Sequence, residues 1–312
     1  MKKPALLVLG ILLLAFISIY FIIPQNITAT STVTVDAIDG NVFKFLVKKE
    51  AWPKWWPGSH LVADSNLFAY NGTTYTIKKD ANSYIEVNIN TTKVELDSKI
   101  NYLAADDGST AITWEASKQS SLNPFERITE FVRIKNQQTE MDSILAHFKQ
   151  FIQKDTNVYG LSIKIVKLKD EFMLATNTVT KTPPSEDLIY GMLDRLHKQI
   201  AAQNATETNK PMLNINKTDS NEYHVMVAIP INKTIPPGAN AVINKLLLGG
   251  NSIQTGVKGG RGTIDNAFGQ LQNFRKDYKL TGVAMPFELM LTDRSMEKDT
   301  SKWVTQLYWP IL

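Results

Sequence analysis

The chain has 312 residues, 43% of them hydrophobic, which is enough to fill the cores of two domains and excludes a disordered protein. Its 34 basic and 30 acidic residues leave a net charge of +4 and form no basic block, so the sequence predicts no nucleic-acid partner. Because the chain has no cysteine, disulfides and thiolate metal sites are excluded.

The N-terminal segment, residues 1–24, predicts a transmembrane signal anchor. Residues 5–23 form an apolar run that, at about 1.5 Å per helical residue, spans the ~30 Å hydrocarbon core of a bilayer. Lys2 and Lys3 precede the run, so the positive-inside tendency predicts a cytoplasmic N-terminus and an extracytoplasmic body. A cleaved signal peptide is the alternative, although its apolar region is normally only about 7–15 residues long.

Residues 25–157 predict an α+β domain. A strand at 31–37 and a short helix at 40–47 lead to a tryptophan-rich cluster at 52–57, which we expect to fill the core together with Trp114. Alternating apolar and polar residues predict further strands at 67–69, 73–78, 84–89, 94–103, 110–116 and 130–134. One-sided apolar spacing predicts a long helix at 136–154. This order predicts a helix-grip domain, in which a curled antiparallel sheet surrounds the C-terminal helix.

Residues 160–312 predict a second domain built from a duplicated unit. Apolar residues recur at i, i+3, i+4 and i+7 in two stretches, as on one side of a helix. The two sets are Ile189, Met192, Leu193, Leu196 and Ile200, and Ile264, Ala267, Phe268, Leu271 and Phe274 with Arg275.

Each predicted helix has the same strand-like neighbours. One run precedes it (172–178; 252–257) and two follow it (211–216 and 223–231; 284–292 and 302–311). Both copies close on a proline and an isoleucine, Pro230-Ile231 and Pro310-Ile311. Two strand-helix-strand-strand units side by side would share a core, and the seam between them is the kind of place where small molecules bind.

Two family resemblances cover nearly all of the chain beyond residue 24. Residues of about 30–155, with "VFKFLVKKEAWPKWWPG" and the strand "AITWEAS", resemble the START-like, polyketide-cyclase-like superfamily (SRPBCC). Residues of about 172–312, with "GGRGTIDNAFGQLQNFRKDY" and the duplicated unit, resemble the gyrase-inhibitor-like (GyrI-like), effector-binding domain of multidrug-sensing transcription regulators.

The second resemblance implies a ligand site at Glu288. In that family a carboxylate among aromatic side chains in the seam recognises cationic, apolar ligands, and Glu288 in "PFELML" occupies the matching position. A carboxylate in an apolar pocket pairs strongly with a desolvated cation. The first repeat has Leu213 at the equivalent point, and the tyrosine usual two residues after the glutamate is replaced by Met290. The alternative is that Glu288 points into water from an edge strand.

Aromatic residues near the seam are the remaining ligand candidates. Strand alternation predicts Trp303 and Trp309 on one face of the last strand and Tyr308 on the other, so they do not all line one pocket. Core packing is the alternative for most of them. With Glu288, the candidate ligand-binding residues are Trp309, Tyr308, Tyr190, Phe268 and Trp303.

The sequence predicts neither a metal nor a cofactor. The four histidines lie far apart, without the H-x-x-x-H spacing of a zinc site. The glycine-rich segment at 259–262 lacks a G-x-G-x-x-G or Gly-Lys-Ser/Thr pattern, and a turn between a strand and a helix accounts for it.

We therefore predict a single-pass cell-membrane protein whose extracytoplasmic body binds an apolar small molecule, neutral or cationic, in the seam of the second domain. Two alternatives stay open. One is a hydrolase of a reactive small molecule with Glu288 as general base, which the loss of the tyrosine and the lack of a second acid or nucleophile disfavour. The other is an envelope module that binds a protein partner through its aromatic surfaces.

Overall fold

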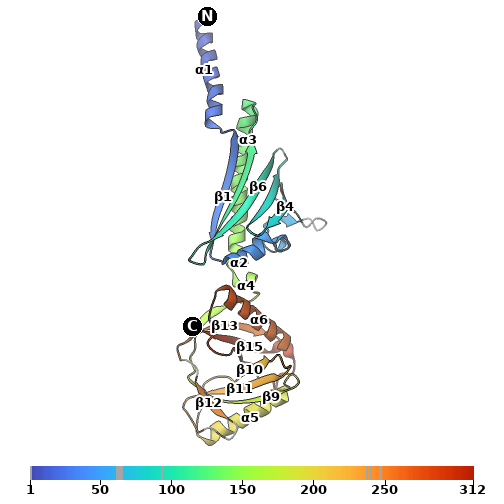
Figure 1. Cartoon of the computed structure of the whole chain (residues 1–312), viewed down its shortest axis with the longest axis vertical. Coiled ribbons are helices and arrows are strands. Elements are labelled where there is room, and N and C mark those ends of the chain that lie inside the picture. Colours follow the sequence, from blue (N-terminus) through green and yellow to red (C-terminus); the bar gives the residue numbers. More distant parts are fainter. Residues whose placement is uncertain (1, 61–65, 93, 237, 239–240, 246–247) are drawn as a thin grey trace. The chain divides into compact units, whose positions relative to one another are not determined.

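The computed structural model describes residues 2–60, 66–92, 94–236, 238, 241–245 and 248–312, without the side chains of residues 2–9, 12 and 15. The chain divides into two compact units, Met1–Lys154 and Asp155–Leu312, whereas the sequence pattern places the boundary at residues 157–160. Each unit contains one antiparallel sheet with helices, so the fold is of the α+β class (Figure 1).

The first unit is a seven-stranded sheet that curls into a half-barrel along one long helix, α3. The strand order is β1-β7-β6-β5-β4-β3-β2. Its helices are α1 (Lys2–Ile22), α2 (Asp39–Val42) and α3 (Pro124–Ile152), with a π-helical turn at Phe43–Val47 and a 3-10 turn at Lys49–Lys54. Its strands are β1 (Asn26–Val35), β2 (Ser59–His60), β3 (Leu67–Tyr70), β4 (Thr73–Ala81), β5 (Tyr84–Asn90), β6 (Glu95–Ala104) and β7 (Thr110–Gln119).

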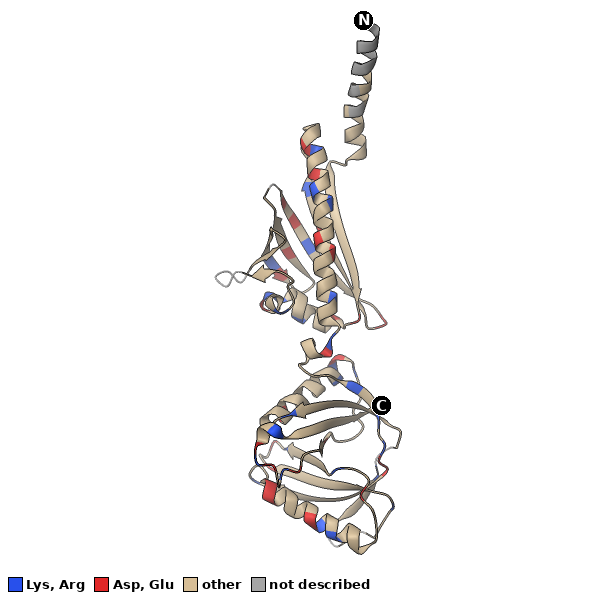
Figure 2. Cartoon of the chain, turned by 180° about the vertical axis from the view of Figure 1, so that it is seen from behind, with Lys and Arg blue, Asp and Glu red and all other residues tan. Residues whose placement is uncertain are grey.

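Helix α3 begins twelve residues earlier than its apolar spacing predicts, at Pro124 instead of residue 136. The predicted strand at 130–134 is therefore wrong, because these residues lie inside the helix. The start is set by Asn123, whose side chain accepts hydrogen bonds from the backbone N–H groups of Phe125 and Glu126, and by Pro124 in the first turn. Basic and acidic residues are interspersed along α3, and no long run of one sign occurs (Figure 2).

Indole rings fill the interior between the first sheet and α3. Trp52, Trp55 and Trp114 are at most 1% exposed, and Trp52 stacks on Trp56 with centroids 5.2 Å apart. Trp52 Nε1 donates to the Leu46 carbonyl at 2.6 Å, which satisfies the polar end of the ring. The tryptophans thus have the packing role that the sequence predicts.

The predicted anchor coincides with α1. In the portion of the chain that the structure describes, no helix combines the length and apolar character that a membrane span needs. Many side chains of the predicted anchor, those of residues 1–9, 12 and 15, lie outside the described residues.

The second unit is an eight-stranded antiparallel sheet with two long helices, α5 (Glu186–Ala202) and α6 (Arg261–Asp277), each packed on its own half of the sheet (Figure 1). Short α4 (Asp155–Val158) and a 3-10 turn (Thr300–Lys302) complete its helices within the described residues. The strands are β8 (Lys164–Lys167), β9 (Phe172–Thr180), β10 (Met212–Lys217), β11 (Tyr223–Ile231), β12 (Val242–Lys245), β13 (Asn251–Lys258), β14 (Phe287–Met290) and β15 (Val304–Ile311).

The strand order β12-β9-β11-β10-β14-β15-β13-β8 is the order of a duplicated unit. Strands β9, β10 and β11 with α5 form one repeat, β13, β14 and β15 with α6 form the other, and β10 pairs with β14 at the seam. Ile231 pairs with Phe172 in the first repeat, and Ile311 pairs with Asn251 in the second. These registers relate the two repeats residue by residue.

The two faces of this sheet carry separate apolar clusters. Leu213 and its neighbours on alternate strand positions pack against α5 on the helix face. Met212, Ala228 and Phe287 belong to a second cluster, which the strand alternation places on the opposite face. A ligand site at the seam can therefore lie on either face.

Candidate functional site

Glu288 lies within β14 on the helix face, opposite Leu213 of β10, and its side chain is 1% exposed. Its Oε2 accepts a hydrogen bond from Nη2 of Arg294 at 2.7 Å, and its Oε1 accepts one from Nη1 of Arg261. Glu288 thus does not point into water, and both oxygens bind guanidinium groups of the chain itself. A cationic ligand at this carboxylate would compete with two arginines.

Arg294 connects three of the predicted site residues. Its buried guanidinium binds Glu288, donates to Thr305 Oγ1 at 3.0 Å and lies 4.8 Å from the centroid of the Trp303 ring. Its backbone N–H donates to the hydroxyl of Tyr190 at 2.5 Å. Burial raises the pKa of Tyr190, so the hydroxyl keeps its proton at neutral pH. Glu288, Trp303 and Tyr190 therefore form one polar cluster around Arg294.

The first residues of the two long helices complete this cluster. α5 begins with Glu186 and α6 with Arg261, which are corresponding positions of the two repeats. Oε2 of Glu186 is buried and accepts no hydrogen bond from any residue that the structure describes. Burial raises the pKa of Glu186, against the opposing effect of Arg294. The cluster holds two arginines and two glutamates, so no single negative charge dominates it.

The other predicted residues lie in different places. Phe268 and Trp309 line a pocket of about 430 Å³ beside α6, together with Arg261. Tyr190 lines a pocket of about 590 Å³ beside α5. Tyr308 lies on the opposite face of the sheet, as the strand alternation predicts, where its ring stacks on Phe287 at 5.1 Å and 8°. The structure thus does not gather all six residues around one cavity, and their role as ligand contacts stays a prediction.

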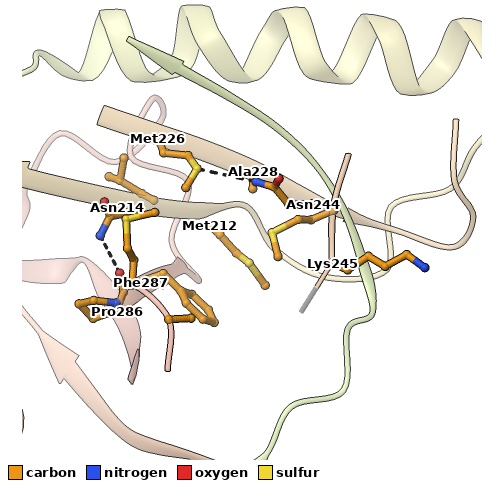
Figure 3. A pocket seen from close by; sticks show the side chains of 12 residues that line it. Met212, Asn214, Met226, Ala228, Asn244, Lys245, Pro286 and Phe287 are labelled. Atoms are coloured by element: carbon orange, nitrogen blue, oxygen red, sulfur yellow. Dashed lines mark hydrogen bonds between the residues drawn. The ribbon is translucent and has the colours of Figure 1, made fainter. Parts of the chain in front are cut away.

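A methionine-lined pocket of about 220 Å³ lies at the seam on the face opposite the helices (Figure 3). Two polar side chains at its wall are already engaged: Asn214 Nδ2 donates to the Pro286 carbonyl at 2.7 Å, and Asn244 Nδ2 lies 4.0 Å from the sulfur of Met226. Lys245 also lines the pocket, but its ammonium lies 4.9 Å from the centroid of the Phe172 ring. The other lining residues that the structure describes are apolar. They include Met173, Met212, Met226, Met285, Ala228 and Phe287.

The two repeats differ at a pair of corresponding positions beside this pocket. Met212 pairs with Ala228 in the first repeat, and Phe287 pairs with Tyr308 in the second. Ala228 and Tyr308 stand two residues before Pro230 and Pro310, so they are corresponding positions. The tyrosine ring covers Phe287, whereas the methyl group of Ala228 leaves open space beside Met212. The open space beside Met212 therefore lies where the second repeat holds the Tyr308 ring.

Sequence reasoning missed both arginines and the methionines. Arg261 was obscured because its glycine-rich segment reads as a turn, and Arg294 lies in a loop with no periodicity. The methionine pocket had a signal in the sequence: Met226 and Ala228 stand at alternate positions of one predicted strand, and aligning the repeats sets Ala228 against Tyr308. Strand alternation combined with that alignment predicts a smaller side chain on one face of the first repeat.

No protein-family model and no curated protein matches the sequence. Solved structures with a similar chain path include the C-terminal domain of EcmrR (13% identity, 49% of this chain and 98% of that one, TM-score 0.42) and SAV2435 bound to tetraphenylphosphonium (12%, 48% and 93%, 0.34). CalU16 from Micromonospora echinospora is a third (11%, 56% and 86%, 0.31). At these identities and scores, the likenesses carry no argument about ligand or activity.

Proposed function

We propose that the second unit is a small-molecule binding domain whose ligand is held by its apolar part in the methionine pocket at the seam. The observation that carries this proposal is an apolar cavity between two repeats, with four methionines and Phe287 at its wall and only a few polar groups. Unbranched thioether side chains adapt to ligands of different shape and favour contacts with aromatic rings. The pocket therefore fits an apolar, ring-containing or chain-like compound.

Methionine methyl signals test the location of binding directly. The full chain, labelled with ¹³C in its methionine methyl groups, is titrated with N-phenyl-1-naphthylamine, a neutral apolar probe. We expect shifts at Met212 and Met226, and none at Met141 of the first core or Met192 on the helix face. Shifts confined to Met192 and Met290 would instead place the probe on the helix face and contradict the proposal.

Filling the pocket provides the second test. Ala228→Tyr copies into the first repeat the residue that the second repeat already holds at the corresponding position. If the ring excludes about 100 Å² of apolar probe surface, the binding free energy should fall by about 2.5 kcal/mol at ~25 cal/mol per Å², which raises Kd roughly 70-fold. The matched control is Ala202→Tyr at the exposed end of α5, which should leave Kd unchanged.

The prediction that a cation pairs with Glu288 needs its own test. Tetraphenylphosphonium, the compound bound to SAV2435, serves as the cationic probe. If a cation binds at Glu288, then Glu288→Gln should weaken the binding of tetraphenylphosphonium by about 1–3 kcal/mol and leave the binding of the neutral probe unchanged. Arg261 and Arg294 already bind both carboxylate oxygens. We therefore expect the substitution to change the binding of both probes by the same small amount.

We also propose that residues 1–24 tether the body to a membrane, with the N-terminus in the cytoplasm. The support is the apolar run at 5–23 behind Lys2 and Lys3. The full chain should remain in the membrane fraction after carbonate extraction, and protease added outside should cut the body once any outer barrier is opened. A soluble mature chain beginning near Ala29 would contradict the tether.

A further inference from the structure

The end of the first unit that carries α1 also exposes an apolar surface on α3. We propose that the start of α3 lies in the interfacial layer of the lipid bilayer beside α1, so that the body contacts the membrane through a second helix. This inference rests on the proposed tether, because α1 would bring α3 to the bilayer.

Four large apolar side chains are exposed at the start of α3 and in the turn before it. Leu122 and Phe125 are 80% and 66% exposed, and Ile128 and Val132 are 40% and 51% exposed. Phe125, Ile128 and Val132 recur at i, i+3 and i+7, so they lie on one face of the helix. The buried Ile134 stands on the opposite side, so this face points away from the first sheet. A contiguous exposed apolar surface of this kind marks a contact with protein or membrane.

The membrane is favoured because α1 contacts this same surface. Figure 1 shows the start of α3 beside the end of α1 that leads into β1. The rings of Phe16 and Phe125 meet edge to face with centroids 5.5 Å apart, and the Tyr20 hydroxyl donates to the Leu122 carbonyl at 2.6 Å. The exposed apolar face of α3 is therefore continuous with the apolar run at 5–23, which is the part of the chain proposed to lie in lipid.

The contact between Phe16 and Phe125 sets the depth that α3 would reach. Tyrosine is enriched where a membrane meets water, which places Tyr20 of α1 at that level. Phe16 stands four residues before Tyr20, or roughly 6 Å along the helix at ~1.5 Å per residue. Phe125, beside Phe16, would then lie about 6 Å below the interface, within the ~5–10 Å to which apolar helix faces enter the boundary of headgroups and acyl chains.

Polar groups at the start of α3 are bound within the chain, as a contact with lipid requires. The Ser121 hydroxyl donates to Glu126 at 2.6 Å, and the Ser121 N–H donates to Glu130 at 2.8 Å. Arg127 is buried, and its Nε donates to the carbonyl of Ile23 at 3.0 Å. A polar group that enters a bilayer without a partner is costly. These bonds therefore make the polar side of this helix end compatible with lipid beside its apolar face.

Single cysteines can test this contact, because the chain has no cysteine of its own. Leu122→Cys and Ile128→Cys, each in the full chain, are labelled with the environment-sensitive fluorophore NBD and reconstituted into phosphatidylcholine vesicles. Both variants keep Phe125 for its contact with Phe16. A fraction of the lipid carries a nitroxide, which quenches NBD on contact, near either the glycerol end or the methyl end of an acyl chain. We expect both labels to lose emission, more strongly with the nitroxide near the glycerol end.

Two further labelled positions provide the controls. Ser143→Cys is the matched control on α3, because Ser143 is exposed and stands five helical turns, roughly 27 Å, beyond Phe125 on the same face. Its label should keep its emission with either nitroxide. Ile11→Cys reports on the tether alone, because Ile11 lies near the middle of the apolar run at 5–23. Its label should be quenched more strongly by the nitroxide near the methyl end. All four positions are exposed, so the variants should fold.

The outcomes separate this inference from the proposed tether. If the label at Ile11 is not quenched, the tether itself fails. If it is quenched while the labels at Leu122 and Ile128 behave like the label at Ser143, the tether stands and the second contact is wrong. Emission that rises at Leu122 and Ile128 without quenching would place protein against this face and overturn the inference. Quenching at both positions, with none at Ser143, supports it.

Discussion

The buried pair of Glu288 and Arg294 yields the sharpest prediction about stability. Glu288→Leu places in β14 the residue type that its partner across the seam, Leu213, already has, but it leaves Arg294 buried without its carboxylate. Arg294→Met leaves Glu288 with Arg261 alone. Both side chains are 1% exposed, so solvent screens neither charge. Each single substitution should therefore cost about 3–5 kcal/mol.

The double variant should be far less destabilised than either single variant. Leu and Met together replace the charged pair by apolar groups of similar volume, a change that is often neutral or stabilising by about 1–4 kcal/mol. Arg261 keeps its ion pair with Asp265 at 2.7 Å, so its loss of Glu288 should cost little. The expected coupling between the two substitutions is at least about 3 kcal/mol.

The free energies of unfolding of the three variants are measured by urea unfolding of the full chain. The unfolding is monitored through hydrogen exchange of peptides from β10, β14 and β15. Peptides of the first sheet provide an internal reference, because the substitutions lie in the other compact unit. Additive losses in the double variant, or single losses below about 1 kcal/mol, would refute the view that Glu288 and Arg294 depend on each other.

Three further predictions concern single residues. Because burial raises the pKa of Glu186, the folded state binds its proton more tightly than the unfolded state does. The free energy of unfolding should therefore fall as the pH rises above about 4.3, the ordinary pKa of a glutamate; Glu186→Gln should remove this fall and change little at lower pH, as unfolding midpoints would show. Gly58→Ala should lower the free energy of unfolding of the first unit by about 1–3 kcal/mol, because the added Cβ would collide with the Ala69 carbonyl oxygen; an unchanged denaturation midpoint would contradict this clash. Trp55→Ala should cost about 3–5 kcal/mol, measured by the same denaturation, since the ring is 1% exposed and packs on Phe148 with centroids 4.7 Å apart.

Helix periodicity predicted the core positions of both helices, except that Phe268 and Arg275 of α6 are only partly buried. Ile189, Met192, Leu193, Leu196 and Ile200 are all buried on α5. This success has a physical reason: each helix covers one face of a sheet, so its apolar positions must recur with the helical period. The strand that follows each helix was predicted to within three residues at either end, at 211–216 for β10 (Met212–Lys217) and at 284–292 for β14 (Phe287–Met290).

The start of α3 and the charges at the seam could not be predicted in the same way. Residues 130–134 alternate like a strand, and the helix is decided upstream by the cap at Asn123. The partners of Glu288 come from positions 27 residues before it and 6 residues after it, so only the folded arrangement brings the three charges together. The edge strand β12 was not predicted, because it has only four residues and ends in a lysine.

The pairing of Leu213 with Glu288 across the seam has a consequence for symmetry. In a dimer of two identical single repeats, the residue at this point would face its own copy, and paired positions in antiparallel strands lie only about 4.5–5.5 Å apart. A glutamate would then oppose a glutamate in the interior, whereas a leucine would oppose a leucine without penalty. Because the two repeats are joined in one chain, these two positions can hold different residues. The buried charge of Glu288 can therefore lie beside the approximate twofold axis between the repeats, with both arginine partners contributed by the second repeat.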